Sequence, residues 1–514
     1  MPYSFSYQTL LSLILLLSLS VPTRANDWPT WRMNSQRSAH TEQQIPDTLH
    51  LQWVHQLPRL DPAFKNARLQ FDAGYEPIVK NGILFYGSSS TNSLTAIEVK
   101  TGKELWRFFS NGPIRLAPVA WKDSVLFGTD DGYLYSLSAQ TGNLQWKFQA
   151  VPSSRLILGN RRLISVWPIR GGPVIEDDTI FFAAGVWPFE GVFIYALNAE
   201  TGEQRWVNDR LGFLYGQHPH AAEAFGGVTP QGYLLIAEEE LIVPCGTAFP
   251  ARLNKKTGEL IEFKLPKAGR KPGGWFTAAG KSARRGEIEV PKPDLIFDRD
   301  INSARHENGK HYGPNGKRGV LQQIQVGDKP LSYQSQFPGV TGTIHSLLAA
   351  SNRLFVVTLE GSIYCLGPDK TKATSYKSPL LNRSAPVPAQ ATTSDTDSMI
   401  SNRINTGGYV FLAGIPDEKL IDDLLTNKDI QIVVFDTDLK QITALRQKYY
   451  QRGRNTANTS FLNGSLEDVV LPAYFAQLII AQAPEQSGFK SLAQLVSKMY
   501  PSIRPYGGAL LLKC

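Results

Sequence analysis

The chain is poor in cysteine and carries no recognisable catalytic motif. Only 3 of its 514 residues are cysteine, Cys245, Cys365 and Cys514, which is too few for a disulfide framework. No Cys-x-x-Cys-His motif occurs, so a covalently attached haem is excluded. No nucleophile elbow, phosphate-binding loop, zinc motif or paired-carboxylate signature stands out. The sequence therefore offers no complete set of catalytic residues.

The charge of the chain is mild for its length. Hydrophobic residues make up 42% and charged residues 19%, which are globular values, and the net charge is +8. Much of the positive charge lies between residues 264 and 318. Because aromatic residues are not interleaved with the basic ones there, we expect no nucleic-acid partner. A solvated loop insertion explains this stretch more simply than a surface for polyanions.

One apolar run marks the N-terminus as a targeting segment. Leu10 to Val21 is almost unbroken Leu, Ile, Ser and Val, and it is too short to span a bilayer comfortably. Thr23-Arg24-Ala25 supplies small residues for cleavage after Ala25. No cysteine follows the run, so we do not expect a lipid anchor. We expect residues 1–25 to be a signal peptide and the mature protein to be periplasmic or secreted, with an uncleaved anchor as the alternative.

One sequence pattern recurs in the first half of the chain. Three segments carry Thr-Gly followed by Trp, and a fourth keeps Thr-Gly but ends on Phe263. The members are Thr101, Gly102 and Trp106; Thr141, Gly142 and Trp146; Thr201, Gly202 and Trp206; and Thr257 and Gly258. The first two copies lie 40 residues apart, and the later, longer spacings indicate loops inserted into a common core. Self-similarity at this period indicates a repeat architecture.

Each copy predicts about four short antiparallel strands. An alternating, aromatic-rich strand such as 133–137 precedes the Thr-Gly turn, where glycine allows a positive φ, and a last strand carries the Trp. Units of about 40 residues with four strands are propeller blades, and a blade buries its two faces only against neighbouring blades. We expect each indole to pack between blades and to bond a carbonyl next door. The segment 51–57 is expected to close the ring.

The repeat resembles the tryptophan-docking repeat of the pyrroloquinoline quinone (PQQ)-like propellers. The resemblance covers roughly residues 26–370, and it implies a mainly β fold, a propeller of about six to seven blades. That family includes quinoprotein alcohol dehydrogenases and non-enzymatic periplasmic propellers, and the repeat residues are packing residues that do not specify chemistry. The dehydrogenases commonly carry an adjacent Cys-Cys pair against their cofactor and need calcium. This chain has no such pair, which counts against a quinone enzyme.

A second domain is expected after a linker. Residues 371–405 are rich in Ser, Thr, Pro and Ala, which is typical of a linker. From 406 to 514 the pattern alternates between strand and helix, with strands at 409–413, 430–435, 476–481 and 508–513 and helices at 417–425, 439–450 and 492–500. Alternating βα units predict a parallel, doubly wound sheet of the α/β Rossmann-like class.

Motifs in this domain resemble the fold of S-adenosylmethionine (SAM)-dependent methyltransferases. The resemblance implies that Gly414 forms the turn after the first strand, that Asp436 binds the ribose, and that the loop with Ser465 and Leu466 lies near the adenine. Only Gly414 remains of the usual glycines, Pro416 lacks an N–H, and Glu418 adds negative charge at the helix start. The family's sheet normally has further strands beyond this point. We therefore expect a degenerate domain, and a truncated reading frame would account for the missing strands.

Two further groups of residues are weaker candidates. His218, His220 and Glu223 have residue types that suit a transition metal, but a polar blade loop explains them better, so we expect no metal site. Trp167, Trp187 and Trp275 lie in loop contexts, where they either stack on a flat ligand or a sugar or cap a neighbouring loop.

Together these patterns predict an exported binding or scaffold module with a degenerate methyltransferase-like domain. Its partner is expected to be a protein or a small-molecule ligand at the propeller mouth. The alternatives are a SAM-dependent methyltransferase and a PQQ-dependent dehydrogenase. PQQ and SAM are the candidate cofactors, and neither has a complete site in the sequence. Catalytic residues, substrate and oligomeric state stay open.

Overall fold

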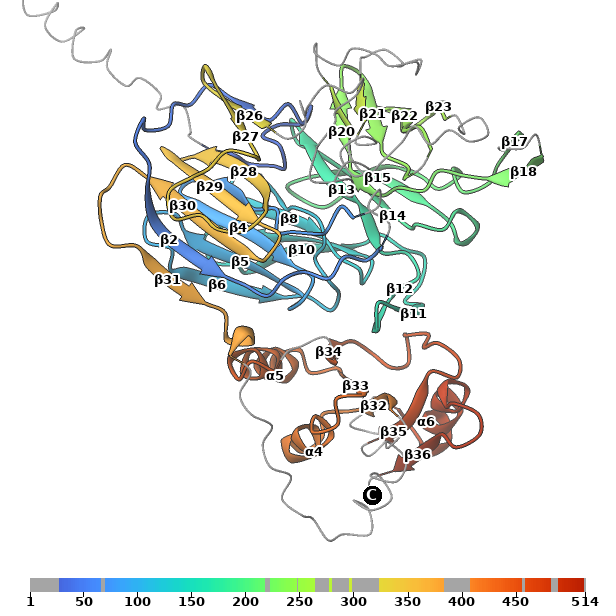
Figure 1. Cartoon of the computed structure of the whole chain (residues 1–514). Helices are drawn as coiled ribbons and strands as arrows, with labels where there is room; N and C mark the ends of the chain where they lie inside the picture. Colours follow the sequence, from blue (N-terminus) through green and yellow to red (C-terminus); the bar gives the residue numbers. More distant parts are fainter. Residues whose placement is uncertain are drawn as a thin grey trace, which may run out of the picture.

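The computed structural model describes residues 27–65, 70–217, 222–246, 248–263, 277–279, 295–297, 323–382, 407–454, 458–481 and 489–512. Figure 1 shows a group of β-sheets above a smaller body with helices. The proposed signal peptide, most of the basic stretch and most of the proposed linker lie outside the described residues. Among the residues that are described, no helix is both long and apolar enough to cross a membrane.

Five sheets of four or five strands form the upper group, and their strands pair antiparallel except at one edge of the third and of the fifth sheet. The first blade is β3 (Ile78–Lys80), β4 (Ile83–Ser88), β5 (Ser93–Glu98) and β6 (Glu104–Phe109). The second is β7 (Val119–Trp121), β8 (Ser124–Gly128), β9 (Tyr133–Ser138) and β10 (Leu144–Gln149). The third is β13 (Ile169–Glu176), β14 (Thr179–Ala184), β15 (Phe193–Asn198) and β16 (Gln204–Asn208), with β19 (Gly232–Tyr233) added at its edge.

The fourth and fifth blades complete the set in the described part of the chain. The fourth is β20 (Leu235–Ala237), β21 (Glu240–Val243), β22 (Ala251–Asn254) and β23 (Leu260–Glu262). The fifth is β28 (Ile344–Ala350), β29 (Arg353–Thr358), β30 (Ser362–Gly367), β2 (His50–Gln56) and β31 (Thr374–Lys377). Smaller sheets are β1 (His40–Thr41) with β26 (Gln323–Val326) and β27 (Lys329–Ser332), and the hairpin of β24 (Thr277–Ala279) and β25 (Leu295–Phe297). The sequence predicts six to seven blades, and the described residues form five.

Each repeated tryptophan docks on the Thr-Gly turn of the following blade. The indole N–H of Trp106 donates to Ala139 O at 3.1 Å, that of Trp146 to Glu200 O at 2.9 Å, and that of Trp206 to Lys255 O at 3.1 Å. The predicted packing of indoles between blades is therefore confirmed for these copies. Trp53 of β2 makes the equivalent bond to Val99 O, at 2.9 Å.

The chemistry of the turn explains why Thr and Gly recur. The Thr hydroxyl accepts the backbone N–H two residues on, as in Asn143 N to Thr141 Oγ1 at 3.3 Å. The glycines have φ between +72° and +79°, which a side chain disfavours. A Cβ added at Gly142 would lie 2.6 Å from the Trp106 ring, and one at Gly202 would lie 2.9 Å from the Trp146 ring. Glycine is needed twice over, for the backbone conformation and for the indole above it.

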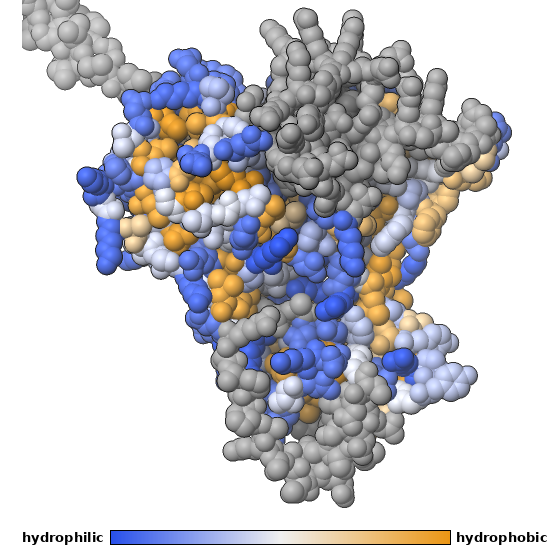
Figure 2. All heavy atoms as spheres, in the orientation of Figure 1, coloured by the Kyte–Doolittle hydropathy of each residue, from blue (hydrophilic) through white to orange (hydrophobic). Residues whose placement is uncertain are grey.

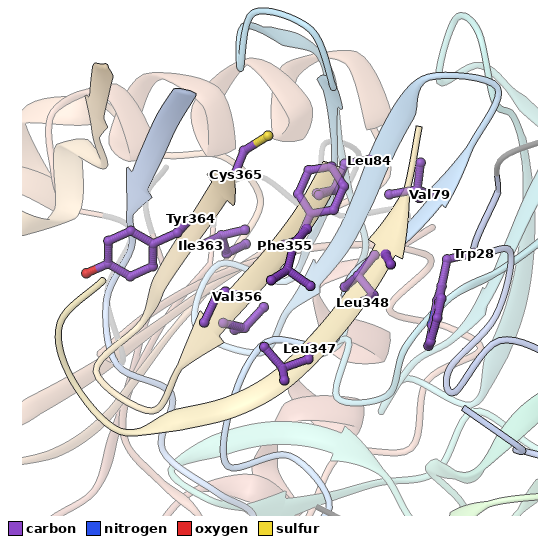
Figure 3. Close-up of a cluster of buried hydrophobic side chains, with 14 of the residues drawn as sticks. Trp28, Val79, Leu84, Leu347, Leu348, Phe355, Val356, Ile363, Tyr364 and Cys365 are labelled. Atoms are coloured by element: carbon purple, nitrogen blue, oxygen red, sulfur yellow. The ribbon is translucent and has the colours of Figure 1, made fainter. Parts of the chain in front are cut away.

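The fifth blade joins the two ends of the propeller region. Strand β2 pairs antiparallel with β30, so residues near the N-terminus supply a strand to the last blade, as the sequence predicts. The seam to the first blade is apolar: Figure 3 shows Leu84 and Val79 of the first blade beside Phe355 and Leu348 of the fifth. Strand β31 pairs parallel with β2, so residues 374–377, assigned by composition to the linker, belong to this blade.

The segment 27–39 runs along the first strands of four blades. Trp28 exchanges two backbone hydrogen bonds with Val79 of β3, and Pro29 O accepts from Ala120 N of β7. Further along, Ser35 O accepts from Ile236 N of β20. The first strands of adjacent blades contact one another, so they line the axis. The N-terminal segment therefore packs across the axis and leaves less open space there.

The lower body contains a five-stranded parallel sheet with the order β34-β33-β32-β35-β36. Its elements are β32 (Gly408–Ala413), α4 (Glu418–Leu424), β33 (Ile430–Asp436), α5 (Leu439–Gln451), β34 (Thr459–Asn463), β35 (Ala476–Ala481), α6 (Leu492–Met499) and β36 (Ala509–Leu512). Four strands and three helices match the sequence expectation closely. The strand β34 was missed, because its five residues are flanked by polar segments and carry only Phe461 and Leu462 as large apolar residues.

The two faces of this sheet are covered differently. Helices α4 and α5 cover one face, where Ile421 and Ile442 pack on Val410 and Ile432. Helix α6 covers only part of the other face. The connection from β34 to β35, residues 464–475, contains no helix. The rest of that face needs another partner.

We predict that Gly202→Ala destabilises the protein more than Gly82→Ala. Both glycines have φ of +75°, but nothing lies within 4 Å of a Cβ at Gly82. Gly82→Ala therefore costs the conformational term alone, about 1–2 kcal/mol. Gly202→Ala also displaces the Trp146 indole, which costs roughly 1–3 kcal/mol more. Urea unfolding followed by tryptophan fluorescence measures both, and equal losses would contradict the docking of this indole.

Candidate functional site

Polar side chains gather at two places, the propeller axis and the junction between the propeller and the C-terminal sheet. At the axis, Arg115 bridges Asp72 at 2.5 Å and Asp130 at 2.6 Å, and Arg170 also binds Asp130 at 2.6 Å. All four side chains are buried. Burial alone would raise the pKa of Asp130, but Arg170 and Arg115 outweigh it and hold that pKa below its usual value. The four charges satisfy one another.

A second buried cation is held in the same region. Arg37 is fully buried and donates to Leu234 O at 2.8 Å, to Pro173 O at 2.9 Å and to the Thr30 hydroxyl at 2.7 Å. Burial lowers the pKa of Arg37 to about 9. The Trp31 and Tyr233 rings stack 3.8 Å apart beside it. The Arg37 guanidinium and the two rings are therefore already engaged by other groups of the protein.

At the junction, the hairpin of β11 (Leu156–Gly159) and β12 (Arg162–Ser165) covers the open face of the C-terminal sheet. Leu163 packs in one cluster with Phe411 and Val433 of the sheet, and Leu156 packs against the same cluster. Leu156 N donates to Val470 O at 2.8 Å, and Val470 N donates to Ser154 O at 3.1 Å. The propeller thus supplies cover that the helix-free connection after β34 does not provide.

Polar bonds fix the same junction. Asn111 donates to Asn463 O at 2.7 Å and accepts from Asn463 N at 2.9 Å. Arg446 of α5 donates to Phe109 O at 3.1 Å and to the Asn111 side chain at 2.6 Å. Burial lowers the pKa of Arg446 to about 10. These bonds therefore hold the end of β34 and helix α5 against the end of the first blade and the residues that follow it.

Between these contacts lies a pocket of about 200 Å³. We call it the junction pocket. Its propeller side comes from β9, β10 and the β11–β12 hairpin, and its other side comes from the ends of β33 and β34 and the loop that follows. Its polar lining includes Asp131, Tyr133, Lys147, Gln149, Ser154, Ser465 and Asp468. About half of its surface is apolar and half is polar.

Asp131 has an unusual environment at the floor of the junction pocket. The hydroxyls of Thr129 and Tyr135 and the backbone N–H of Tyr133 donate to its carboxylate. Burial raises the pKa of Asp131 in spite of these bonds. Burial, and next the charge of Asp131, raise the pKa of Tyr135 well above its ordinary value. Titratable groups with shifted pKa values in a concave site are candidates for function.

The structure separates the predicted SAM-site residues. Ser465 lines the junction pocket, whereas Leu466 is 2% exposed and packs in the core beneath it. Gly414 has φ of +92°, as a tight turn after β32 requires. The Asp436 carboxylate accepts Ile415 N at 3.0 Å and Asp438 N at 2.7 Å. Asp436 therefore fixes the two loops at this edge of the sheet.

The remaining candidates are placed only in part. His218 and His220 lie outside the described residues, and Glu223 accepts the Tyr215 hydroxyl at 3.3 Å. Trp167 is buried and donates to Glu190 O at 2.6 Å, while Trp187 is exposed and Trp275 is not described. No group of three or more His, Cys, Asp or Glu side chains arranged for a metal occurs in the described part of the chain.

Comparison with known proteins concerns the repeat region. Residues 23–206 match a family model described as outer membrane protein assembly factor BamB. The dehydrogenase subunit of the quinone alcohol dehydrogenase of Gluconobacter oxydans is 30% identical over 142 residues, which are 25% of this chain and 18% of that protein. A quinoprotein alcohol dehydrogenase of Pseudomonas putida is 26% identical over 155 residues, 27% of this chain and 24% of that one. The region is built from PQQ-like repeats and has quinoprotein alcohol dehydrogenases among its homologues.

Two solved structures are similar at low scores. The quinohemoprotein alcohol dehydrogenase of Comamonas testosteroni has 16% identity and a TM-score of 0.38, over 64% of this chain and 57% of that one. BamB of Moraxella catarrhalis has 16% identity and a TM-score of 0.32, over 62% of this chain and 100% of that one. The chain spans less than a quarter of the length of the curated relatives it matches.

The two candidate cofactors fit their sites to different degrees. PQQ is flat and anionic, and the axial groups that suit such a molecule, Arg37, Arg115, Arg170 and the stacked Trp31, are committed to bonds within the protein. The described axial residues therefore do not fit PQQ. For SAM, Gly414 and Asp436 are in place, and each Asp436 oxygen keeps a free lone pair.

We predict that Leu163→Ala, in the propeller hairpin, loosens the C-terminal sheet. Leu163 is 3% exposed, and its loss leaves a cavity against Phe411 and Val433 that costs about 2–5 kcal/mol. Leu158→Ala in the same hairpin is the control, because Leu158 is 42% exposed. Hydrogen exchange is expected to speed up in β33 and β34 for Leu163→Ala only. Unchanged exchange there would mean that the hairpin does not support the sheet.

Proposed function

We propose that the chain is an exported scaffold that binds a protein partner through its propeller. The observation that carries this proposal is an exposed aromatic surface on a projecting hairpin. The hairpin consists of β17 (Leu214–Gln217) and β18 (Glu223–Gly226), and it extends from the third blade in Figure 1. Figure 2 shows hydrophobic colours along it. Soluble proteins rarely leave contiguous large apolar side chains in water without a binding role.

Four aromatic residues make up this surface. Phe213 is 60% exposed, Tyr215 62% and Phe225 68%, and Phe189, in the short helix η2 (Pro188–Glu190), is 69% exposed. Tyr215 and Phe225 are cross-strand partners with ring centroids 5.2 Å apart, and Phe213, two residues before Tyr215, shares their face. A Cβ added at Gly212 would lie 2.3 Å from Pro188 O, so η2 abuts the start of the hairpin. We name these four residues the aromatic hairpin surface.

Residue chemistry supports a protein as the partner. Aromatic side chains dominate the energetics of protein interfaces because they bury a large area at little cost in conformational entropy. The assembly factor described by the matching family model supports a scaffold reading as well. The signal peptide that the sequence predicts would place the protein in the periplasm or outside the cell. The proposal also includes a division into two domains, residues 26–370 and residues 406–514.

We predict that a photo-crosslinking residue at Phe225 captures a discrete partner in cells that produce the protein. The same group at Lys256, an exposed residue of the fourth blade, is the control. The double variant Phe213→Ser/Tyr215→Ser is expected to abolish the crosslink from position 225 without changing the melting temperature, because both side chains lie mostly in water. A crosslink that survives this variant, or one equally strong from position 256, contradicts the proposal. So does turnover of an alcohol by purified protein with added PQQ and calcium.

A SAM-binding role for the C-terminal domain is the second candidate. The sheet order, the positive φ of Gly414 and the position of Asp436 at the end of β33 favour it. In that role Gly414 would let the cofactor approach the backbone, and Asp436 would bind the ribose hydroxyls. Bound SAM would supply an activated methyl group. Pro416 and Glu418 are the residues that weaken this candidate.

We predict that calorimetry with one matched pair of variants decides whether SAM binds at Asp436. If SAM binds, Asp436→Asn is expected to weaken binding at least tenfold, because a charged acceptor for two hydroxyls is lost. Asp438→Asn is the control, since the Asp438 side chain caps α5, where it accepts Gln441 N at 3.0 Å and Gln441 Nε2 at 2.8 Å. Absence of heat at millimolar SAM would remove this candidate and leave the scaffold proposal intact.

A further inference from the structure

We propose that the junction pocket binds a small, neutral, polyhydroxylated molecule of monosaccharide size. No part of this proposal depends on the aromatic hairpin surface, because the two sites share no residue. The argument rests on the size of the pocket, on its unused polar groups and on the two domains that form it.

Size restricts the ligand first. The pocket holds about 200 Å³, whereas sites for drug-sized ligands and cofactors measure about 300–1,000 Å³. At about 30 Å³ for each water molecule in the liquid, the space is equivalent to roughly seven waters. A monosaccharide replaces such a cluster with its own hydroxyl groups. A dinucleotide or a folded peptide segment does not fit.

Polar residues whose bonding capacity no described residue uses line this space from both domains. On the propeller side, Gln149 accepts the Tyr133 hydroxyl at 3.1 Å through its carbonyl oxygen, and its amide nitrogen keeps both N–H groups available within the described structure. The Ser154 hydroxyl lines the same wall. From the C-terminal domain comes the Ser465 hydroxyl. Hydroxyl groups of a ligand both donate and accept, so they match this mixture.

Charge favours a neutral ligand. Lys147 lies with its ammonium 5.1 Å from the centre of the Tyr133 ring, and Asp468 lines the opposite side. No ion pair of either residue occurs among the described residues. Asp131 adds a second carboxylate beneath them, and the buried Arg446 guanidinium lies close enough for the charge of Asp131 to oppose the lowering of the Arg446 pKa by burial. Two cations, Lys147 and Arg446, therefore stand against two carboxylates, Asp468 and Asp131, and this balance favours neither an anion nor a cation.

The apolar half of the pocket suits the same ligand class. Val151, Leu156 and Leu163 from the propeller and Phe435 and Leu462 from the C-terminal sheet line it. Sugars present C–H faces as well as hydroxyl edges, so a pocket that is half apolar and half polar can contact both. Because Leu156 and Leu163 also belong to the shared core, the bound molecule would bridge the two domains.

The test is calorimetry on the mature chain with neutral monosaccharides, including glucose, galactose, mannose and N-acetylglucosamine. Free amino acids and inorganic phosphate are the zwitterionic and anionic comparators. At least one sugar is expected to give heat, and the comparators none. Hydrogen exchange with the binding sugar is expected to slow in β10 and in residues 463–469 together. Absence of heat with every sugar, binding of a comparator instead, or protection confined to one domain overturns the proposal.

Matched variants sharpen the test. Gln149→Leu and Lys147→Met each remove polar atoms from the pocket wall on an outer strand, and each is expected to weaken sugar binding about tenfold, or about 1.4 kcal/mol. Lys256→Met is the control, because it removes the same charge from the fourth blade. Exchange protection in the wild-type protein gives a readout that does not depend on how the variants fold. Unchanged affinity in both pocket variants also overturns the proposal.

Discussion

The docking of an indole on a Thr-Gly turn is the interaction on which the propeller depends. Each of Trp53, Trp106, Trp146 and Trp206 gives its N–H to a carbonyl of the neighbouring blade and covers a glycine that has no Cβ to prevent the contact. The hydrogen bond fixes the orientation of the indole and the ring buries a large apolar area, so successive blades pack in one register. Because Trp53 comes from β2, the fifth blade docks on the first with a residue from the other end of the region.

Burial of apolar surface between neighbouring elements also explains how the C-terminal sheet is held. A parallel sheet needs cover on both faces, and the connection from β34 to β35 has no helix to provide it. The β11–β12 hairpin fills that position with Leu163, and Asn111 and Arg446 bond the backbone beside it. An apolar face that would otherwise meet water is buried by the propeller hairpin. The propeller and the C-terminal sheet therefore share one hydrophobic cluster at the junction.

Local patterns predicted what local physics determines. The Thr-Gly-Trp repeat encodes a turn and a docking residue within about 40 residues, so the blades, their packing and the closing strand followed from the sequence. The βα alternation likewise predicted the parallel sheet, except for β34, whose five residues carry too little apolar periodicity. The site resisted prediction because its parts are distant in sequence. Nothing in the residues around Asp131 indicates that Ser465 lies across from them, and the spacing of Asp436 did not reveal that its carboxylate holds two backbone N–H groups.

The distribution of satisfied polar groups indicates where this molecule can interact with others. At the axis, Asp130 is held by two arginines and Arg37 by four acceptors, so a ligand there would have to break bonds that are costly to leave unmade in a buried site. At the junction, the pocket is lined by polar residues that can form further hydrogen bonds: Lys147, Gln149, Ser154 and Ser465. In the aromatic hairpin surface, on the hairpin and the adjoining η2, four aromatic rings lie mostly in water. Burial of these apolar rings would favour a partner at the aromatic hairpin surface, whereas hydrogen bonding would favour a small ligand in the junction pocket. The packed axis would then hold these two sites in a fixed relation to each other.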